Sequence, residues 1–202
     1  MDDTFELALK RARRTSEILR EQKIRHAIAG GFGVYALVRE VDGFAHVSAN
    51  VDLLIERKDF KQAVKELSRA EIVLVELKHN RHRLDSVRAI FAGERFQEGD
   101  LFIQPPLDEH LTYPTTSGFE GLLLRPLLMT KLIAFRAVDK LHVQDLLECN
   151  LITPEIERSL PYDLRVRLES IVASAADDLE CGLAMRVTLG RFSGTIQKAK
   201  NS

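Results

Sequence analysis

The sequence has few cysteines and no long apolar run, and both absences narrow the classes of protein it can encode. Its 202 residues include two cysteines, Cys149 and Cys181, which are far apart and outside any C-x-x-C pattern. This spacing supports neither a disulfide framework nor a zinc site, so we expect two reduced thiols. No segment approaches the roughly 18 apolar residues of a membrane span, and the amphipathic start of the chain has no signal-peptide pattern. These features predict a cytoplasmic protein that does not enter a membrane.

The chain also has almost no excess of charge of either sign. Its 29 Lys and Arg residues are balanced by 30 Asp and Glu residues, which gives a formal net charge of -1. A global electrostatic attraction to nucleic acid or to a membrane is therefore not expected. Basic residues do gather locally, within residues 10–14 and in the stretch KHNRHR at 78–83. We expect both stretches to be solvated, with contact to nucleotide or RNA phosphates as the alternative.

Length and composition are ordinary for a globular protein. The chain is 45% hydrophobic and 29% charged, and it is long enough for one domain, or for one domain with a helical appendage. Apolar residues recur at helical spacing in some segments and form short runs in others, which predicts an α+β fold. The run at 72–77 is nearly all apolar, which is typical of a strand inside a sheet. Helices are expected at 2–22, 32–39, 59–69, 127–138, 140–149 and within 153–181, and strands at 24–29, 51–56, 72–77 and 84–91, with shorter strands at 101–104 and 111–112.

A glycine pair, Gly30-Gly31, separates the first predicted strand from the helix that follows it. Glycine lets the backbone approach an anionic group closely, and the start of the helix supplies free N–H donors and a favourable dipole. Taken alone, the pair is more typical of a tight structural turn. Its position becomes informative through the strand that comes next.

That next strand is entered through Asn50-Val51-Asp52. Because side chains alternate along a strand, Asn50 and Asp52 project from the same side. Two carboxylates placed in this way can bridge two metal ions, which is the arrangement that nucleotidyl transfer uses. Here Asp52 supplies a carboxylate, whereas Asn50 supplies only a neutral carbonyl oxygen. The glycine turn and Asp52 together predict a phosphate site with a weakened metal site.

The order of these features resembles the nucleotidyltransferase superfamily, which has the DNA polymerase beta-like fold, and in particular the small bacterial AbiEii-like nucleotidyltransferases. The family pattern is Gly-Gly, a helix, and then Arg-x-Thr-x-Asp-x-Asp at the start of a strand. Residues 46–52 read HVSANVD here, so among the polar positions only Asp52 is kept, and Ser48 stands at the threonine position. The resemblance covers residues 20–150 approximately.

The family has a third carboxylate on a later strand, often within Arg-Val-Asp-Leu-Leu-Phe-Ala-Gly. Residues 86–93 read SVRAIFAG, and alignment on Phe-Ala-Gly puts Arg88 at the aspartate position. Alignment on Arg83-Leu84-Asp85 instead puts Asp85 there and restores a second carboxylate. The two alignments differ by three residues, so Asp85 and Arg88 point to opposite faces of the strand. We favour Arg88, because its alignment continues through Phe-Ala-Gly without a gap.

Residues 127–147, LLMTKLIAFRAVDKLHVQDLL, resemble the family's helical segment with its Lys-Leu-x-Ala core and a later Asp-Leu-Leu. The resemblance implies that Lys131 lies near the triphosphate, although a lysine at a helix edge is more commonly solvated. Asp139, Lys140 and Asp145 match a charged cluster in the family. A simpler interpretation is that these three residues tie two helices together.

The resemblance implies a nucleotidyltransferase-like mixed β-sheet flanked by helices over residues 1–125, with a C-terminal helical region, residues 126–202, packed on it. It implies a nucleotide-binding protein whose two-metal site is incomplete, so that Mg2+ binds weakly and an NTP is ligand or substrate. The expected catalytic positions are Asp52 and Asn50, the candidate metal ligands are Asp52 and Asp85, and the candidate nucleotide-binding residues are Gly30, Gly31, Ser48, Arg88 and Lys131.

Two other functions stay open at this point. The chain could be an active enzyme that transfers a nucleotidyl group from an NTP to a hydroxyl of a protein, an RNA or a small molecule, using Asp52 with Asp85 or Asn50. It could instead be a non-catalytic module that binds a protein partner in a toxin-antitoxin or phage-defence pair.

Overall fold

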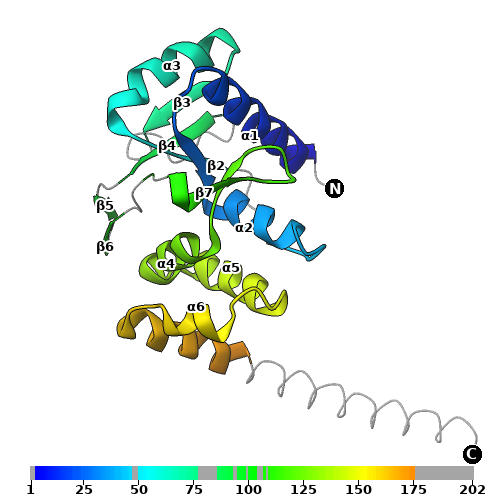
Figure 1. Ribbon diagram of the computed structural model, residues 1–202, viewed down its shortest axis with the longest axis vertical. Helices are drawn as coiled ribbons and strands as arrows, with labels where there is room; N and C mark the ends of the chain where they lie inside the picture. The colour runs from blue at the N-terminus through cyan, green and yellow to red at the C-terminus, as the bar shows by residue number, and fades with distance from the viewer. Residues whose placement is uncertain are drawn as a thin grey trace, which may run out of the picture.

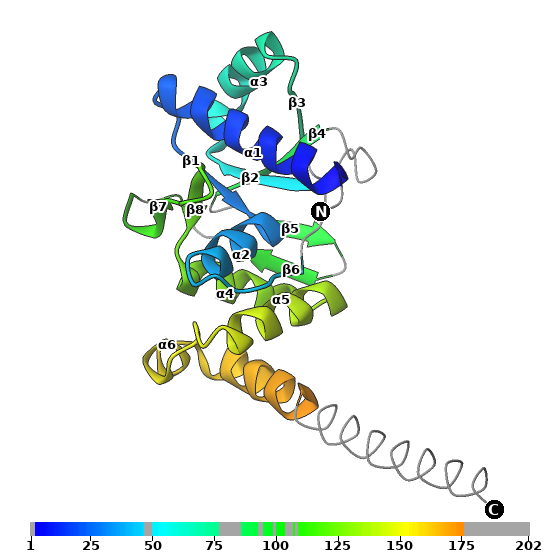
Figure 2. The same cartoon turned by 90° about the vertical axis from the view of Figure 1, so that its right-hand side faces the viewer.

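The fold is built around a mixed sheet with the strand order β3-β4-β2-β1-β8-β7. The computed structural model describes residues 3–46, 50–76, 86–92, 95–98, 100–103, 107 and 109–175. Figures 1 and 2 show helices α1 and α3 at one end of the molecule and α4, α5 and α6 at the other, with the sheet between them. The predicted α+β class is confirmed at this level.

The first helix, α1 (Asp3–Glu21), packs an apolar face onto β1 (His26–Ala29) and β2 (Val51–Ile55). Its buried residues fall at helical spacing, as the sequence pattern predicted. Phe5 of this helix stacks on Phe32 of α2 (Gly30–Arg39) with ring centroids 5.6 Å apart. The contact joins the two helices that flank β1 in the chain.

The strands pair so that β2 lies between β1 and β4 (Ser86–Phe91). It is antiparallel to β1 and parallel to β4. β3 (Val73–Glu76) pairs with the far side of β4 and lies at the edge of the sheet, so the predicted interior position of this strand is wrong. The apolar residues of β3 are explained by α3 (Phe60–Arg69), which packs against this strand. α3 follows the short helix η1 (Arg57–Asp59).

The other edge of the sheet is formed by two short strands, β7 (Thr112–Pro114) and β8 (Glu120–Leu122). β8 is parallel to β1, and a turn through Gly118 joins it to β7. The short helix η3 (Glu109–Leu111) precedes β7, and a separate two-stranded ribbon is formed by β5 (Arg95–Glu98) and β6 (Asp100–Ile103).

The first helix after the sheet ends earlier than predicted. α4 (Leu124–Ala134) ends at Phe135, which has a left-handed backbone with φ 50°, and α5 (Ala137–Glu148) begins directly after it. The predicted helix to residue 138 is therefore wrong. α6 (Pro154–Arg158) and a helix at 162–175 follow, in agreement with the helical segment predicted within 153–181.

Alternation along the strands divides the core into two apolar clusters on opposite faces of the sheet. Ile28, Leu53 and Ala89 belong to the cluster with α1 and α3, whereas Ala27 and Leu54 belong to the cluster with α4, α5 and the helix at 162–175. Helices α4 and α5 lie between the sheet and α6 with the helix that follows it (Figures 1 and 2), and the domain boundary near residue 125 stays a prediction. None of the helices in the described part of the chain has both the length and the apolar content that a membrane crossing requires.

Candidate functional site

The carboxylate of Asp52 lies directly against the backbone at the start of α2. Antiparallel pairing of β1 and β2 puts Asp52 opposite Ala29, the last residue before the glycine pair. Gly30 has φ +62°, and a Cβ placed on it would lie 2.1 Å from Asp52 Oδ2. Neither the backbone angle nor the space admits a side chain, so the turn requires glycine. The predicted proximity of Asp52 to the glycine turn is confirmed.

Arg88 binds Asp52 from the next strand. The two residues are register partners in the parallel pair of β2 and β4. Arg88 Nε donates to Asp52 Oδ1 at 2.8 Å, and Arg88 Nη2 lies 2.5 Å from the same oxygen. The side chains of Arg88 and Asp52 are 16% and 13% exposed, respectively. The alignment that places Arg88 opposite Asp52 therefore agrees with the structure, whereas Asp85 lies outside the described residues.

This ion pair leaves little of Asp52 for a metal. Asp52 Oδ1 accepts two guanidinium donors and Oδ2 lies beside Gly30, so a divalent ion bound to Asp52 would lie next to the positive charge of Arg88. In the part of the chain that the structure describes, no group of three or more His, Cys, Asp or Glu side chains is placed to hold a metal ion. At the position opposite Asp52 the structure thus has a guanidinium and not a second carboxylate.

Lys131 is buried rather than solvated, and the prediction of a solvated helix-edge lysine is wrong. Its Nζ lies 3.1 Å from Asp139 Oδ1, while Asp139 Oδ2 accepts a 2.7 Å bond from Arg136 Nε. Of the three residues predicted to tie two helices together, Asp139 does so, because its pair with Lys131 joins α4 to α5, whereas Asp145 binds His46 in the loop before β2. Whether Lys131 also contacts a phosphate stays a prediction.

Electrostatic effects connect this second pair to Asp52. Burial lowers the pKa of Lys131, and the negative charges of Asp139 and Asp52 oppose that shift. Burial alone would raise the pKa of Asp139, but hydrogen bonds and charge from Arg136 and Lys131 outweigh it and hold the pKa below its usual value. Asp52 thus lies close enough to Lys131 and Arg136 to interact with both charges.

A third set of contacts holds the loop before β2 against α5. Asp145, which is almost fully buried, accepts hydrogen bonds from the backbone N–H and the Nδ1 of His46, at 2.8 and 2.6 Å. His142 Nε2 donates to the carbonyl oxygen of His46 at 2.9 Å. Among the described residues, Nδ1 of the buried His142 has no hydrogen-bond partner. The sequence pattern did not predict a role for His142, because a single histidine within a helix does not indicate what the side chain contacts.

The structure brings four of the predicted site residues together, from four separate elements. They are Gly30 of α2, Asp52 of β2, Arg88 of β4 and Lys131 of α4. Asn50 is half-buried directly before β2, and Gly31 is buried within the first turn of α2. Ser48 lies outside the described residues.

Comparisons with known proteins assign no family to the chain. Neither a protein-family model nor a curated protein sequence matches it. The relation to nucleotidyltransferases therefore depends on the quoted motifs and their order alone.

The Asp52–Arg88 pair should contribute measurably to stability. Replacing Arg88→Gln leaves a largely buried carboxylate without its cation, and we expect the free energy of unfolding to fall by about 2 kcal/mol. Arg14→Gln is the control, since Arg14 pairs with Glu17 in a half-exposed contact on α1 that contributes about 0.5 kcal/mol or less. Urea denaturation measures both. Adding Asp52→Asn to Arg88→Gln should recover part of the lost stability. Equal losses in Arg88→Gln and Arg14→Gln would show that the Asp52–Arg88 pair contributes no more than a surface pair.

His142 should make the fold sensitive to acid. Burial, followed by the nearby charge of Lys131, lowers the pKa of His142 from 6.5 to about 4. Between these values the unfolded chain binds more protons than the folded protein, so stability falls as the pH falls through this window. From pH 7 to 4.5 the contribution is about 2 kcal/mol, at about 1.4 kcal/mol per pKa unit.

The substitution His142→Gln removes this titration and keeps a donor for the carbonyl of His46. The variant should lose about 2 kcal/mol less than the wild type between pH 7 and 4.5 in urea denaturation. Burial lowers the pKa of His26 as well, but His26 is present in both proteins and cancels in the comparison. Identical pH dependence in the two proteins would show that His142 does not stay neutral in the fold.

Proposed function

We propose that the chain is a nucleotide-binding protein with a nucleotidyltransferase-like fold in which Arg88 replaces a metal-binding carboxylate. The contact of Arg88 with Asp52, directly beside the Gly30 turn, is the observation that carries this proposal. It is the position at which the resemblance implies metal-bound phosphate. A guanidinium can neutralise phosphate by paired hydrogen bonds without any metal.

The order of the elements supports the proposal. β1 leads through Gly30 into α2, β2 returns antiparallel with Asp52 beside that turn, and β4 runs parallel to β2 with Arg88 opposite Asp52. This is the sequence of features that the family resemblance implies. The turn also begins a helix of ten residues, whose N-terminal dipole favours an anion.

The charges around the turn favour an anionic ligand as well. Arg88 pairs with Asp52, and the two cations Lys131 and Arg136 share the single carboxylate of Asp139. These five groups leave one net positive charge beside a helix N-terminus. A phosphate group would add a second partner for Arg88 and relieve the excess.

The same residues do not favour efficient transfer. Phosphoryl transfer by two metals depends on carboxylates that hold the ions and clamp the developing charge. The loss of one such group typically costs about 100- to 1000-fold in rate. With Asn50 and Arg88 at two of the family's carboxylate positions, we infer binding without efficient turnover.

A second candidate function, the partner-binding module, is favoured by exposed apolar side chains in the loop before β2 and on α5, the helix to which that loop is bonded. Phe44 is 76% exposed, and Val138 and Leu141 on α5 are both 42% exposed. The hydrogen bonds between His46 and Asp145 hold this loop on α5. A protein partner that covered Phe44 and Leu141 would use this face whether or not a nucleotide binds.

Nucleotide binding should depend little on Mg2+. The experiment is calorimetric titration of ATP, GTP, CTP and UTP into the full chain, with Mg2+ and with a chelator. We expect at least one NTP to bind, with a Kd that changes by no more than about threefold on removal of the metal, because Arg88 supplies the positive charge. Arg88→Gln should weaken that binding by about ten- to a hundredfold, whereas Arg14→Gln should not.

Each other outcome assigns the chain differently. Strict dependence of binding on Mg2+ would favour the active enzyme, in which Asp52 binds a metal with a further ligand. Absence of binding for all four NTPs would contradict nucleotide binding and leave the partner module.

Restoring the carboxylates should restore metal binding. Asn50→Asp with Arg88→Asp would place acidic groups beside and directly opposite Asp52, and we expect this double variant to bind Mn2+ more tightly than the wild type by tenfold or more, as a rough estimate. Calorimetry measures the metal, and circular dichroism confirms that the variant is folded. Wild-type protein incubated with radiolabelled NTPs and Mg2+ or Mn2+ should transfer no label.

Two results would contradict this reading of the site. One is labelling of the wild-type protein or of a partner that Asp52→Ala abolishes, which would identify an active enzyme. The other is a metal affinity that Arg88→Asp leaves unchanged, which would mean that Arg88 does not control the metal position.

A further inference from the structure

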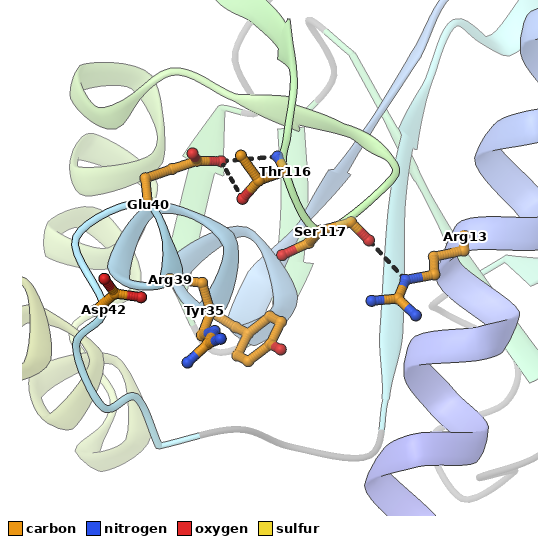
Figure 3. A pocket seen from close by; sticks show the side chains of 7 residues that line it. All are labelled: Arg13, Tyr35, Arg39, Glu40, Asp42, Thr116 and Ser117. Carbon is orange, nitrogen blue, oxygen red and sulfur yellow. Dashed lines mark hydrogen bonds between the residues drawn. The ribbon is translucent and has the colours of Figure 1, made fainter.

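A pocket of about 390 Å³ lies at the opposite end of α2 from the Gly30 turn. It opens between α1, the end of α2 and the turn that joins β7 to β8, and Figure 3 shows the side chains that line it. Its volume is within the range of sites for small molecules. The lining residues are Arg13, Tyr35, Arg39, Glu40, Asp42, Thr116 and Ser117.

Two walls of this pocket are held in place by hydrogen bonds between distant segments. Arg13 Nε donates to the carbonyl oxygen of Ser117 at 2.6 Å, which joins α1 to the β7–β8 turn. Glu40 Oε1 accepts bonds from the backbone N–H and the Oγ1 of Thr116, at 2.9 and 3.1 Å. The turn is thus fixed from both sides, and a ligand would meet preorganised walls.

Two other charged side chains of the lining, those of Arg39 and Asp42, differ from Arg13 and Glu40. Arg39 and Asp42 are exposed, and among the described residues neither side chain has a hydrogen-bond or ion-pair partner, although the backbone N–H of Asp42 donates to the carbonyl oxygen of Arg39 at 3.2 Å. Arg13 bonds to Ser117 through its Nε, and its two terminal amino groups have no hydrogen-bond partner among the described residues, on the wall opposite Arg39. Asp42 has a left-handed backbone with φ 55°, which restricts the direction in which its side chain leaves the chain.

The mixture of charges selects the kind of ligand. A simple anion near Arg39 would meet the carboxylate of Asp42, and a simple cation near Asp42 would meet Arg39. A molecule with a carboxylate and an ammonium group close together satisfies both residues, which are three positions apart at the end of one helix. A second carboxylate at the other end of such a molecule would reach toward Arg13.

We propose that this pocket binds a free amino acid, with an acidic side chain preferred. The α-carboxylate binds Arg39, the α-ammonium group binds Asp42, and the side-chain carboxylate points to Arg13 across the ring of Tyr35. The site is separate from the Gly30 turn and does not depend on nucleotide binding.

The experiment is titration of the full chain with L-glutamate, L-alanine, L-lysine and acetate, followed by calorimetry. L-glutamate should bind most tightly, L-alanine more weakly, and acetate and L-lysine weakest of the four. Asp42→Asn and Arg39→Gln should each weaken L-glutamate by about ten- to a hundredfold, because each removes one charged hydrogen-bond partner. Asn tolerates the left-handed backbone at position 42, so the first variant removes charge without strain.

Glu71→Asn is the matched control, because Glu71 also has a left-handed backbone, with φ 60°, and lies on the turn after α3, outside the pocket. It should leave L-glutamate binding unchanged. Three results would overturn the proposal: no amino acid binding up to about 10 mM, acetate binding as tightly as L-glutamate with a gain on Asp42→Asn, or equal weakening by Asp42→Asn and Glu71→Asn. The second would identify a site for simple anions.

Discussion

The ion pair between Asp52 and Arg88 is the constraint on which the centre of this structure depends. Both side chains leave the sheet on the face whose other residues, such as Ala27 and Leu54, are apolar. A charge on such a face is costly unless it is paired. The pairing therefore favours one register of β2 against β4, because a slip of one residue would send either charge to the opposite face.

The helices that cover this face contain a second buried ion pair. Lys131 is buried among the leucines of α4, and its charge is balanced by Asp139 at the start of α5. Asp139 also binds Arg136, so a single carboxylate serves two cations. Farther along α5, Asp145 holds the loop that leads into β2. The strand that carries Asp52 is thus positioned by the sheet on one side and by α5 through its preceding loop.

Local patterns in the sequence were enough for most of the fold. The apolar period of α1 and the glycine pair at the start of α2 are short-range signals, and both helices formed where these signals predicted them. The place of β3 at the sheet edge could not be read in this way, because an apolar run reports burial and not which neighbour provides it. Burial of β3 comes from α3 on one face, a contact set by the crossover between strands.

The candidate site was predictable in part for a similar reason. The alternation of side chains and the spacing to Phe-Ala-Gly placed Arg88 opposite Asp52 correctly. The burial of Lys131 was not predictable. The apolar pattern of α4 also allows position 131 to lie at an exposed edge of the helix, and the partner, Asp139, is eight residues away on the next helix. The link between His46 and Asp145 spans 99 positions, and no local pattern reports a contact at that separation.

The left-handed residue between α4 and α5 has a further consequence. An uninterrupted helix through Phe135 would hold the backbones of Lys131 and Asp139 about 12 Å apart along its axis, too far for their side chains to share one buried bond. The chain can extend this helix or neutralise its buried lysine, but it cannot do both. The break at Phe135 therefore allows Lys131 and Asp139 to pair, and an insertion or deletion near Phe135 would disturb this pair and the charges near Asp52.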